Sequence, residues 1–333
     1  MNLKKFDKIN RIFAALIFVI ALATYTSTVE PTASYWDCAE YISTSAKLQI
    51  GHPPGAPLFQ MLGAIFSILA LDVTQIAYAV NMMSVLSSAL TIMFLFWSIS
   101  LIGKEILQIK EISNLRDAVK IFGSSFLGSI TFTFTDSFWY NAVEAEVYAM
   151  ATLILALLFW LGLKWADDFE KNRSERWLVL ISFVVGLSFG VHFMGLLAIP
   201  SIGLIYYFKK ATNFSIQNFI LANIISVSIL LFIFKLLLPS TLSLFGNLEV
   251  FFVNDLGMPF NSGTIFSALL LIFVVYYSLS YTSEKKLYWF NTSILCLTFV
   301  FIGFSSWLMI PIRSNADTVI NENSPKDARS LLA

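Results

Sequence analysis

The sequence predicts an all-α, polytopic transmembrane protein, and three observations lead to this fold class. Of the 333 residues, 57% are hydrophobic and only 13% are charged, whereas a soluble domain has about 25% charged residues. The apolar residues form runs of a length that can cross a bilayer, and the basic residues gather in alternate connecting segments. The composition excludes a soluble globular protein, a disordered chain and a nucleic-acid binder built on a basic face.

The first apolar run covers residues 12–28 and follows four basic residues. No small-residue cleavage site follows cleanly, so we expect a first transmembrane helix with a cytoplasmic N-terminus rather than a signal peptide. Lys235 stands about a turn before the expected outer end of its helix, where a lysine side chain can snorkel to the interface. Further spans are predicted at 78–102, 121–138, 147–164, 218–238, 264–281 and 290–310.

Two apolar stretches do not have the length of one span. Residues 58–71 are uncharged but too short for the ~20 residues that a crossing needs. Residues 177–208 are too long for one helix, and the sequence there favours two short helices that meet near His192. The residues that interrupt this stretch are Gly186, Gly190, His192, Gly195 and Pro200.

The distribution of basic residues distinguishes the possible topologies. If residues 58–71 dip in and return, 16 of the 21 basic residues lie on the cytoplasmic side; if they cross, only 8 do. The positive-inside rule favours the first arrangement. It predicts about nine spans with the C-terminus outside. The sixteen are Lys4, Lys5, Lys8, Arg11, Lys104, Lys110, Arg116, Lys120, Lys164, Lys171, Arg173, Arg176, Lys209, Lys210, Lys285 and Lys286.

This topology defines the organisation of the chain. Residues 1–310 form a transmembrane domain, which includes a first outer loop at 29–57 and a re-entrant or juxtamembrane helix at 58–71. Residues 311–333 form an outer tail. Twelve of the 21 acidic residues and both histidines then lie on the outer face, so we expect the chemistry at the outer membrane surface.

The first outer loop is the most polar stretch of the chain. A short helix is predicted from Asp37 to Leu48, with the carboxylates of Asp37 and Glu40 on one face and Tyr41 beside them. Such a pair could act as a general base and its orienting partner. Alternatively, the helix floats at the headgroups with its acidic residues in water.

The segment Gly51-His52-Pro53-Pro54-Gly55-Ala56-Pro57 follows this helix. Prolines and glycines favour a rigid turn that brings His52 to the start of the next helix, where backbone N–H groups can bind an anion. A phosphate would suit this position. The other interpretation is a helix-initiating turn with His52 at the surface.

Other candidate residues lie further along the chain. Two residues apart on a helix, Glu144 and Glu146 would point in different directions, so only one is expected to face a cavity. His192 either lines a cavity at a helix break or is a satisfied buried histidine. Arg313 could bind a lipid-linked phosphate or anchor the chain at the interface. The two cysteines and the remaining ligand-type residues show no metal-site spacing, so no metal and no cofactor are predicted.

Several segments resemble successive landmarks of an integral-membrane family, and the likeness runs over essentially the whole chain. The family was first catalogued as a domain of unknown function and includes a vertebrate protein O-mannosyltransferase that acts on plexin-type receptor domains. The first outer loop is most similar to that of bacterial members. The segments are SYWDCAEYISTSAKLQIGHPPGAPLF, FWYNAVEAEVYA, GLSFGVHFMGLLAIP, FVNDLGMPFNSG and MIPIRSNAD.

The resemblance implies a glycosyltransferase of the GT-C class. Members of that class take a sugar from a polyprenyl-phosphate donor and use an acidic residue of the first outer loop. Asp37 is the best match to that residue, and Glu40 the second. The implied partners are the lipid-linked donor, an exported acceptor protein and the bilayer, in a bacterial inner membrane with a periplasmic site. Because family members are usually longer, the chain is expected to be a fragment.

Two other functions remain open at this stage. A transporter or flippase of a lipid-linked sugar would use the same lipid groove, but it would need ionisable residues near the midplane and inverted repeats. A non-catalytic assembly protein would use the acidic loop to bind a partner. The enzyme hypothesis requires Asp37, Glu40, His52 and one of Glu144 or Glu146 to converge on one outer cavity.

Overall fold

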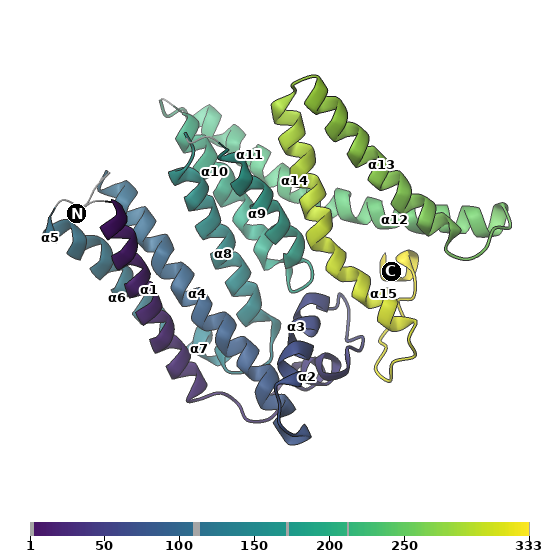
Figure 1. The fold of residues 1–333 in the computed structure, drawn as a ribbon, viewed down its shortest axis with the longest axis horizontal. Helices are drawn as coiled ribbons and strands as arrows, with labels where there is room; N and C mark the ends of the chain where they lie inside the picture. The colour runs from purple at the N-terminus through teal and green to yellow at the C-terminus, as the bar shows by residue number, and fades with distance from the viewer. Residues whose placement is uncertain (1–2, 109–113, 171–172, 212, 333) are drawn as a thin grey trace. The chain divides into compact units, whose positions relative to one another are not determined.

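The computed structural model describes residues 3–108, 114–170, 173–211 and 213–332. The chain is 79% helical, and within the described ranges no strand forms, which confirms the predicted all-α class (Figure 1). Lys110 and Lys171, which the charge argument counted on the cytoplasmic side, lie outside the described residues.

The chain forms two compact units. The first unit comprises Met1–Leu48, Leu58–Glu170 and Val191–Ala198, and the second comprises Gln49–Pro57, Lys171–Gly190 and Ile199–Ala333. The single transmembrane domain expected over 1–310, and the tail after it, stay predictions.

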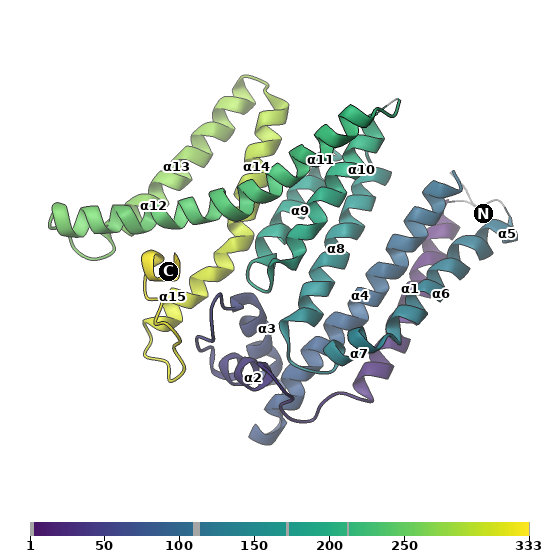
Figure 2. The same ribbon diagram turned by 180° about the vertical axis from the view of Figure 1, so that it is seen from behind.

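The first unit is a group of helices packed on a central helix, α4. In Figures 1 and 2, α1, α6 and α8 lie beside α4. Its helices are α1 (Leu3–Thr26), α2 (Cys38–Lys47), α3 (Pro57–Ile68), α4 (Ile76–Ile106), α5 (Leu115–Ala118), a π-helical turn (Val119–Gly123), α6 (Ser124–Thr133), α7 (Asp136–Ala142), α8 (Val147–Asp167) and a 3-10 turn (Phe193–Leu197).

Aromatic stacking and small polar residues hold this unit together. Phe13 of α1 stacks on Phe96 of α4 and on Phe122, with ring centroids 6.4 and 5.9 Å apart. The buried hydroxyls of Ser87 and Thr91 donate to the carbonyls four residues earlier in α4, at 2.8 and 2.9 Å. Small residues that satisfy themselves in this way let neighbouring transmembrane helices approach closely.

The second unit contains the remaining helices, several of which run directly into one another. They are α9 (Glu175–Ser188), α10 (Ala198–Lys210), α11 (Ile216–Leu231), α12 (Leu238–Val250), α13 (Ser262–Glu284), α14 (Tyr288–Phe304), α15 (Met309–Ser314) and α16 (Ala328–Leu332), with π-helical turns at Phe232–Leu237 and Phe251–Asp255.

Two glycines make a close helix crossing in the second unit. A Cβ atom on Gly186 of α9 would collide with the carbonyl oxygen of Val300 and with the backbone of Gly303 in α14. The expectation that Gly186 interrupts the chain is therefore wrong, because it lies inside α9. The predicted break near His192 is confirmed, since α9 ends at Ser188 and a 3-10 turn begins at Phe193.

Six helical segments of the described chain are long and apolar enough to cross a membrane, and each overlaps a predicted span. They are Phe6–Thr26, Val73–Ile106, Val147–Asp167, Ile216–Asp255, Ser262–Glu284 and Tyr288–Ser314. The span expected at 121–138 differs, since the helix ends at Thr133 and α7 follows separately. The total of nine spans stays a prediction.

The segment Ile216–Asp255 corrects the span predicted at 218–238. It is helical over 40 residues, or about 60 Å at 1.5 Å per residue, twice the ~30 Å hydrocarbon core. Lys235 therefore lies near its middle, not a turn from its end, with its ammonium 4.8 Å from the centroid of the Phe234 ring.

Helix α3 agrees in length with the predicted short apolar helix. It is a 12-residue helix, about 18 Å long, which is too short to cross a bilayer.

Candidate functional site

Helix α2 presents the two carboxylates of the first outer loop on one face, as predicted. Asp37 is the N-cap residue and is exposed, and Glu40 is half-buried in the first turn. Oxygens of the two carboxylates lie within 4.8 Å of each other. The side chain of Asp37 makes no capping hydrogen bond to the helix, so its carboxylate is not used to start α2.

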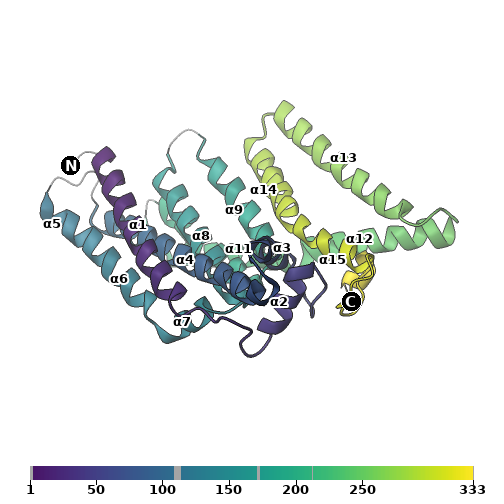
Figure 3. The same cartoon turned by 60° about the horizontal axis from the view of Figure 1, so that its bottom comes forward.

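Helix α2 lies beside α3 (Figure 3), and its side chains Tyr41 and Ser45 contact that helix. The Tyr41 ring lies edge-on to Phe59 with centroids 5.2 Å apart. Gly63 faces Ser45 so closely that a Cβ at Gly63 would lie 2.5 Å from the Ser45 hydroxyl oxygen. These contacts set the orientation of Asp37 and Glu40.

Glu144 and Glu146 do not lie on a helix, and the expectation that they point in different directions is wrong. Both occupy the extended break between α7 and α8, and they are only 5% and 6% exposed. The backbone N–H of Glu146 donates to the carbonyl of Glu144 at 2.9 Å. Both carboxyl groups reach the start of α2.

Hydrogen bonds join this break to Ser34 and Cys38, at the start of α2. The Ser34 hydroxyl donates to Glu144 Oε2 at 2.5 Å and lies 3.0 Å from Cys38 Sγ. The Cys38 thiol donates to Glu146 Oε1 at 3.9 Å. Glu146 also accepts the backbone N–H groups of Val147, at 3.3 Å, and of Asp37.

Burial and neighbouring charges act on two groups of this acidic cluster, which consists of Ser34, Asp37, Cys38, Glu144 and Glu146. Burial, then the negative charges of Asp37 and Glu144, raise the pKa of Glu146. Burial, and the nearby Glu144 and Glu146, raise the pKa of the Cys38 thiol to about 12. A raised pKa favours the protonated form of a carboxyl group, which can donate a hydrogen bond. Asp37, in contrast, is exposed.

His192 belongs to the same unit and contacts the start of α8. Its ring lies 5.5 Å from the ring of Tyr148, and Nδ1 accepts the backbone N–H of Met194 at 3.1 Å. Burial lowers the pKa of His192. In the neutral ring Nδ1 is then the acceptor, so the proton is on Nε2.

His52 and Arg313 lie in the second unit. The Gly55 N–H donates to the His52 carbonyl at 2.9 Å, and Gly55 has φ of +75°, which confirms the predicted turn. Backbone bonds between Ile50 and residues 320 and 322 hold this turn against the segment after α15. Arg313 is half-buried in the last turn of α15.

Several residues of the cluster were not expected from the sequence. Ser34 and Cys38 link the loop to Glu144 and Glu146, which no spacing rule predicts. Tyr35 and Trp36 directly precede Asp37 and are 81% and 88% exposed. Trp36 has φ of +58°, a left-handed conformation that is strained for a bulky residue. In the sequence, the two aromatic residues directly before Asp37 were the signal that could have drawn attention to this position.

The fold and this acidic cluster define an all-α, multi-pass membrane protein with a polar cluster built by the loop before α2 and the α7–α8 break. A sequence profile described as the protein O-mannosyl-transferase TMEM260 N-terminal domain matches residues 37–215. The chain belongs to this family. The matched range contains every candidate site residue except Arg313.

Two curated relatives carry the name of a protein O-mannosyl-transferase. The chain is 27% identical to Protein O-mannosyl-transferase tmem260 of Dictyostelium discoideum over 197 residues, 56% of this chain. It is 24% identical to TMEM260 of Mus musculus over 175 residues, 52% of this chain. In each case the match covers 22% of the relative's length. No solved structure matches the chain.

Proposed function

We propose that the chain is the membrane part of a glycosyltransferase. It transfers a mannose-like sugar from a polyprenyl-phosphate donor to a Ser or Thr hydroxyl of an exported protein. Family membership and the names of the relatives support a protein O-mannosyltransferase. The observation that carries the proposal is the cluster that joins exposed Asp37 to buried Glu144 and Glu146.

Asp37 acts as the general base. Its carboxylate takes the proton of the acceptor hydroxyl while that oxygen attacks the anomeric carbon from the face opposite the phosphate. The bond from the anomeric carbon to the phosphate oxygen breaks, the glycosidic bond forms, and the configuration inverts. Phosphate leaves as an anion, so the leaving group needs no proton.

The other acidic residues prepare this step. Glu40 lies with a carboxylate oxygen within 4.8 Å of that of Asp37 and orients it. Glu146 holds the Asp37 backbone and Glu144 holds Ser34, so the loop is organised before the substrate arrives. The exposed rings of Tyr35 and Trp36 contact the acceptor.

Three residues bind the donor. His52 and Arg313 interact with its phosphate, since a guanidinium group binds phosphate oxygens in bidentate fashion. His192 supplies its Nε2–H to a sugar or phosphate oxygen. The prenyl tail lies in the bilayer of a bacterial inner membrane, and the charge distribution supports a site on the outer face of that membrane.

The test is transfer of radiolabelled sugar from prenyl-phosphate donors to exported proteins in membranes that contain the full-length protein. Asp37→Asn removes the base but keeps the shape, and no cap of α2 is lost. We expect transfer to fall by at least about 100-fold, the contribution typical of a general base.

Asp72→Asn is the matched control. Asp72 is an exposed N-cap acid whose side chain accepts from Thr74, and asparagine caps as well as aspartate. The control should transfer at the wild-type rate. Normal transfer by the Asp37 variant, with equal protein levels, would refute the assignment of the base.

A further inference from the structure

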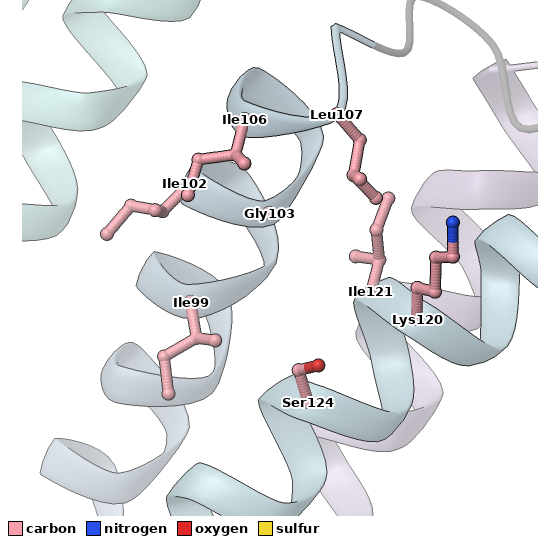
Figure 4. A pocket seen from close by; sticks show the side chains of 8 residues that line it. All are labelled: Ile99, Ile102, Gly103, Ile106, Leu107, Lys120, Ile121 and Ser124. Atoms are coloured by element: carbon pink, nitrogen blue, oxygen red, sulfur yellow. The ribbon is translucent and has the colours of Figure 1, made fainter.

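An apolar cavity of about 360 Å³ lies in the first unit, and none of the residues that line it belongs to the acidic cluster (Figure 4). The aliphatic side chains of Ile99, Ile102 and Ile106 form one wall, on the last turns of α4, and Ile121 forms the other. Ile121 is buried and Ile106 is exposed, so the cavity runs from the helix contact to the protein surface. Its volume is at the lower end of the ~300–1,000 Å³ typical of ligand sites.

The local backbone creates this space. Val119–Gly123 is a π-helical turn, a rare conformation that is frequent at functional sites. Opposite it, Gly103 has no side chain. A Cβ there would lie 3.7 Å from Ile121 Cγ1, an ordinary contact, so a larger residue at position 103 would occupy the cavity without a backbone collision.

One basic side chain, Lys120, lies at the rim of the cavity. The side chain of Lys120 lines the cavity, and in Figure 4 its nitrogen points toward the same end of the cavity as Leu107. The neighbouring Lys104 binds Asp167 at 2.9 Å, and Lys164 lies 3.7 Å from the same carboxylate. Within the described part of the chain, Lys120 is exposed and has no ion pair.

We propose that this cavity holds an acyl chain of an anionic phospholipid, with the Lys120 ammonium against the lipid phosphate. Aliphatic walls suit a hydrocarbon chain, and Ser124 is the one uncharged polar side chain of the lining, which is too few for a polar metabolite or a peptide backbone. In the predicted topology Lys120 and the end of α4 face the cytoplasmic leaflet, which carries anionic lipids.

The test measures lipid bound to the purified full chain by native mass spectrometry, with phosphatidylglycerol or phosphatidylcholine added back. Gly103→Leu fills the cavity, and Gly103→Ala is its control because alanine changes the helix propensity equally but leaves most of the space. Lys120→Gln removes the rim charge. Arg116→Gln removes a basic residue one turn away that does not line the cavity.

We expect wild type and both controls to retain phosphatidylglycerol in preference to phosphatidylcholine. Gly103→Leu should lose it, and Lys120→Gln should bind it about fivefold more weakly, the effect of one basic residue at an anionic membrane surface. Folding should survive, since leucine is a better helix former than glycine. Equal retention by Gly103→Leu and Gly103→Ala, or equal weakening by Lys120→Gln and Arg116→Gln, would overturn the proposal.

Discussion

At the break between α7 and α8, the carboxyl group of Glu146 is excluded from water while it accepts from the backbone of Asp37 and Val147. Glu146 lies outside any helix, so no helical hydrogen bonds fix the backbone there. The hydrogen bonds to its carboxyl group hold the break in place instead. A buried donor left without an acceptor costs about 1–3 kcal/mol. Glu146 therefore stabilises the loop that carries Asp37.

Replacing Glu146 should change stability in a pH-dependent way. Glu146→Ala should lower the free energy of unfolding by about 1–3 kcal/mol, because donors of the loop lose their acceptor. The raised pKa of Glu146 means that the folded state binds its proton more tightly than the unfolded state does. This tighter proton binding contributes to the free energy of unfolding. The contribution is complete below the unfolded-state pKa of Glu146 and is lost as the pH rises through its folded-state pKa.

The measurement is thermal unfolding in detergent between pH 4 and 8. The transition temperature of wild type should fall more with rising pH than that of Glu146→Gln, which keeps an acceptor oxygen but does not titrate. Parallel pH profiles for the two proteins would contradict the role given to burial at this position.

Among the elements, the crossing of α9 and α14 depends on two glycines, Gly186 and Gly303, because they leave no side chain between the helices. Gly186→Ala should destabilise the protein by about 1–3 kcal/mol, the usual cost of overpacking, because the new methyl group meets backbone that cannot rotate away. The expected result is a lower transition temperature in thermal unfolding.

A second helical glycine provides the comparison. A Cβ on Gly123 would lie 3.9 Å from Val119 Cγ1, so Gly123→Ala keeps all backbone contacts. Its transition temperature should stay equal to that of wild type or rise. If both substitutions have the same effect, the close approach at Gly186 is not what stabilises the crossing.

The sequence predicted helices correctly where interactions between residues close together in the chain determine them. The helix predicted from Asp37 to Leu48 covers Cys38–Lys47, and the six long apolar runs are helical. The gap between the spans at 121–138 and 147–164 was predicted, but the non-helical conformation of Glu144 and Glu146 was not. Residues 138–148 contain no proline or glycine, and this conformation depends on Ser34 and Cys38, over 100 positions earlier. Secondary structure set by such distant partners has no local signal.

The extension of α11 into α12 has a different cause. Pro239 directly follows the predicted end of the span, and a proline inside a helix clashes with the carbonyl four residues before it. That carbonyl belongs to Lys235, which lies in the π-helical turn Phe232–Leu237. The wider turn accommodates the proline and the helix continues. Sequence periodicity cannot distinguish this arrangement from a helix end.

For the whole molecule, the charge distribution predicts on which side of the membrane each connecting segment lies, and this can be tested. Thr32, Val73 and Ser283 are exposed, and single cysteines placed there can report their side with a membrane-impermeant maleimide on intact cells. Thr32→Cys and Val73→Cys should both react from outside, because α3 is too short to cross between them. Ser283→Cys should react only after lysis.

The native cysteines set the background of this experiment. Cys38 is buried and Cys296 is half-buried, so unsubstituted protein should label weakly. Protection of Val73→Cys together with reaction of Ser283→Cys would show that α3 crosses, and every later loop would then change sides.

The backbone pairing of Ile50 with the segment after α15 also has a consequence for biosynthesis. The Ile320 N–H donates to the Gln49 side chain at 2.7 Å across a sequence separation of 271, and the Glu322 N–H donates to the Ile50 carbonyl. A ribosome makes the chain from the N-terminus, and helices enter the bilayer as they emerge. The His52 turn therefore acquires these partners only after residue 322 has been synthesised, so one of the first loops to be made is among the last to acquire its contacts.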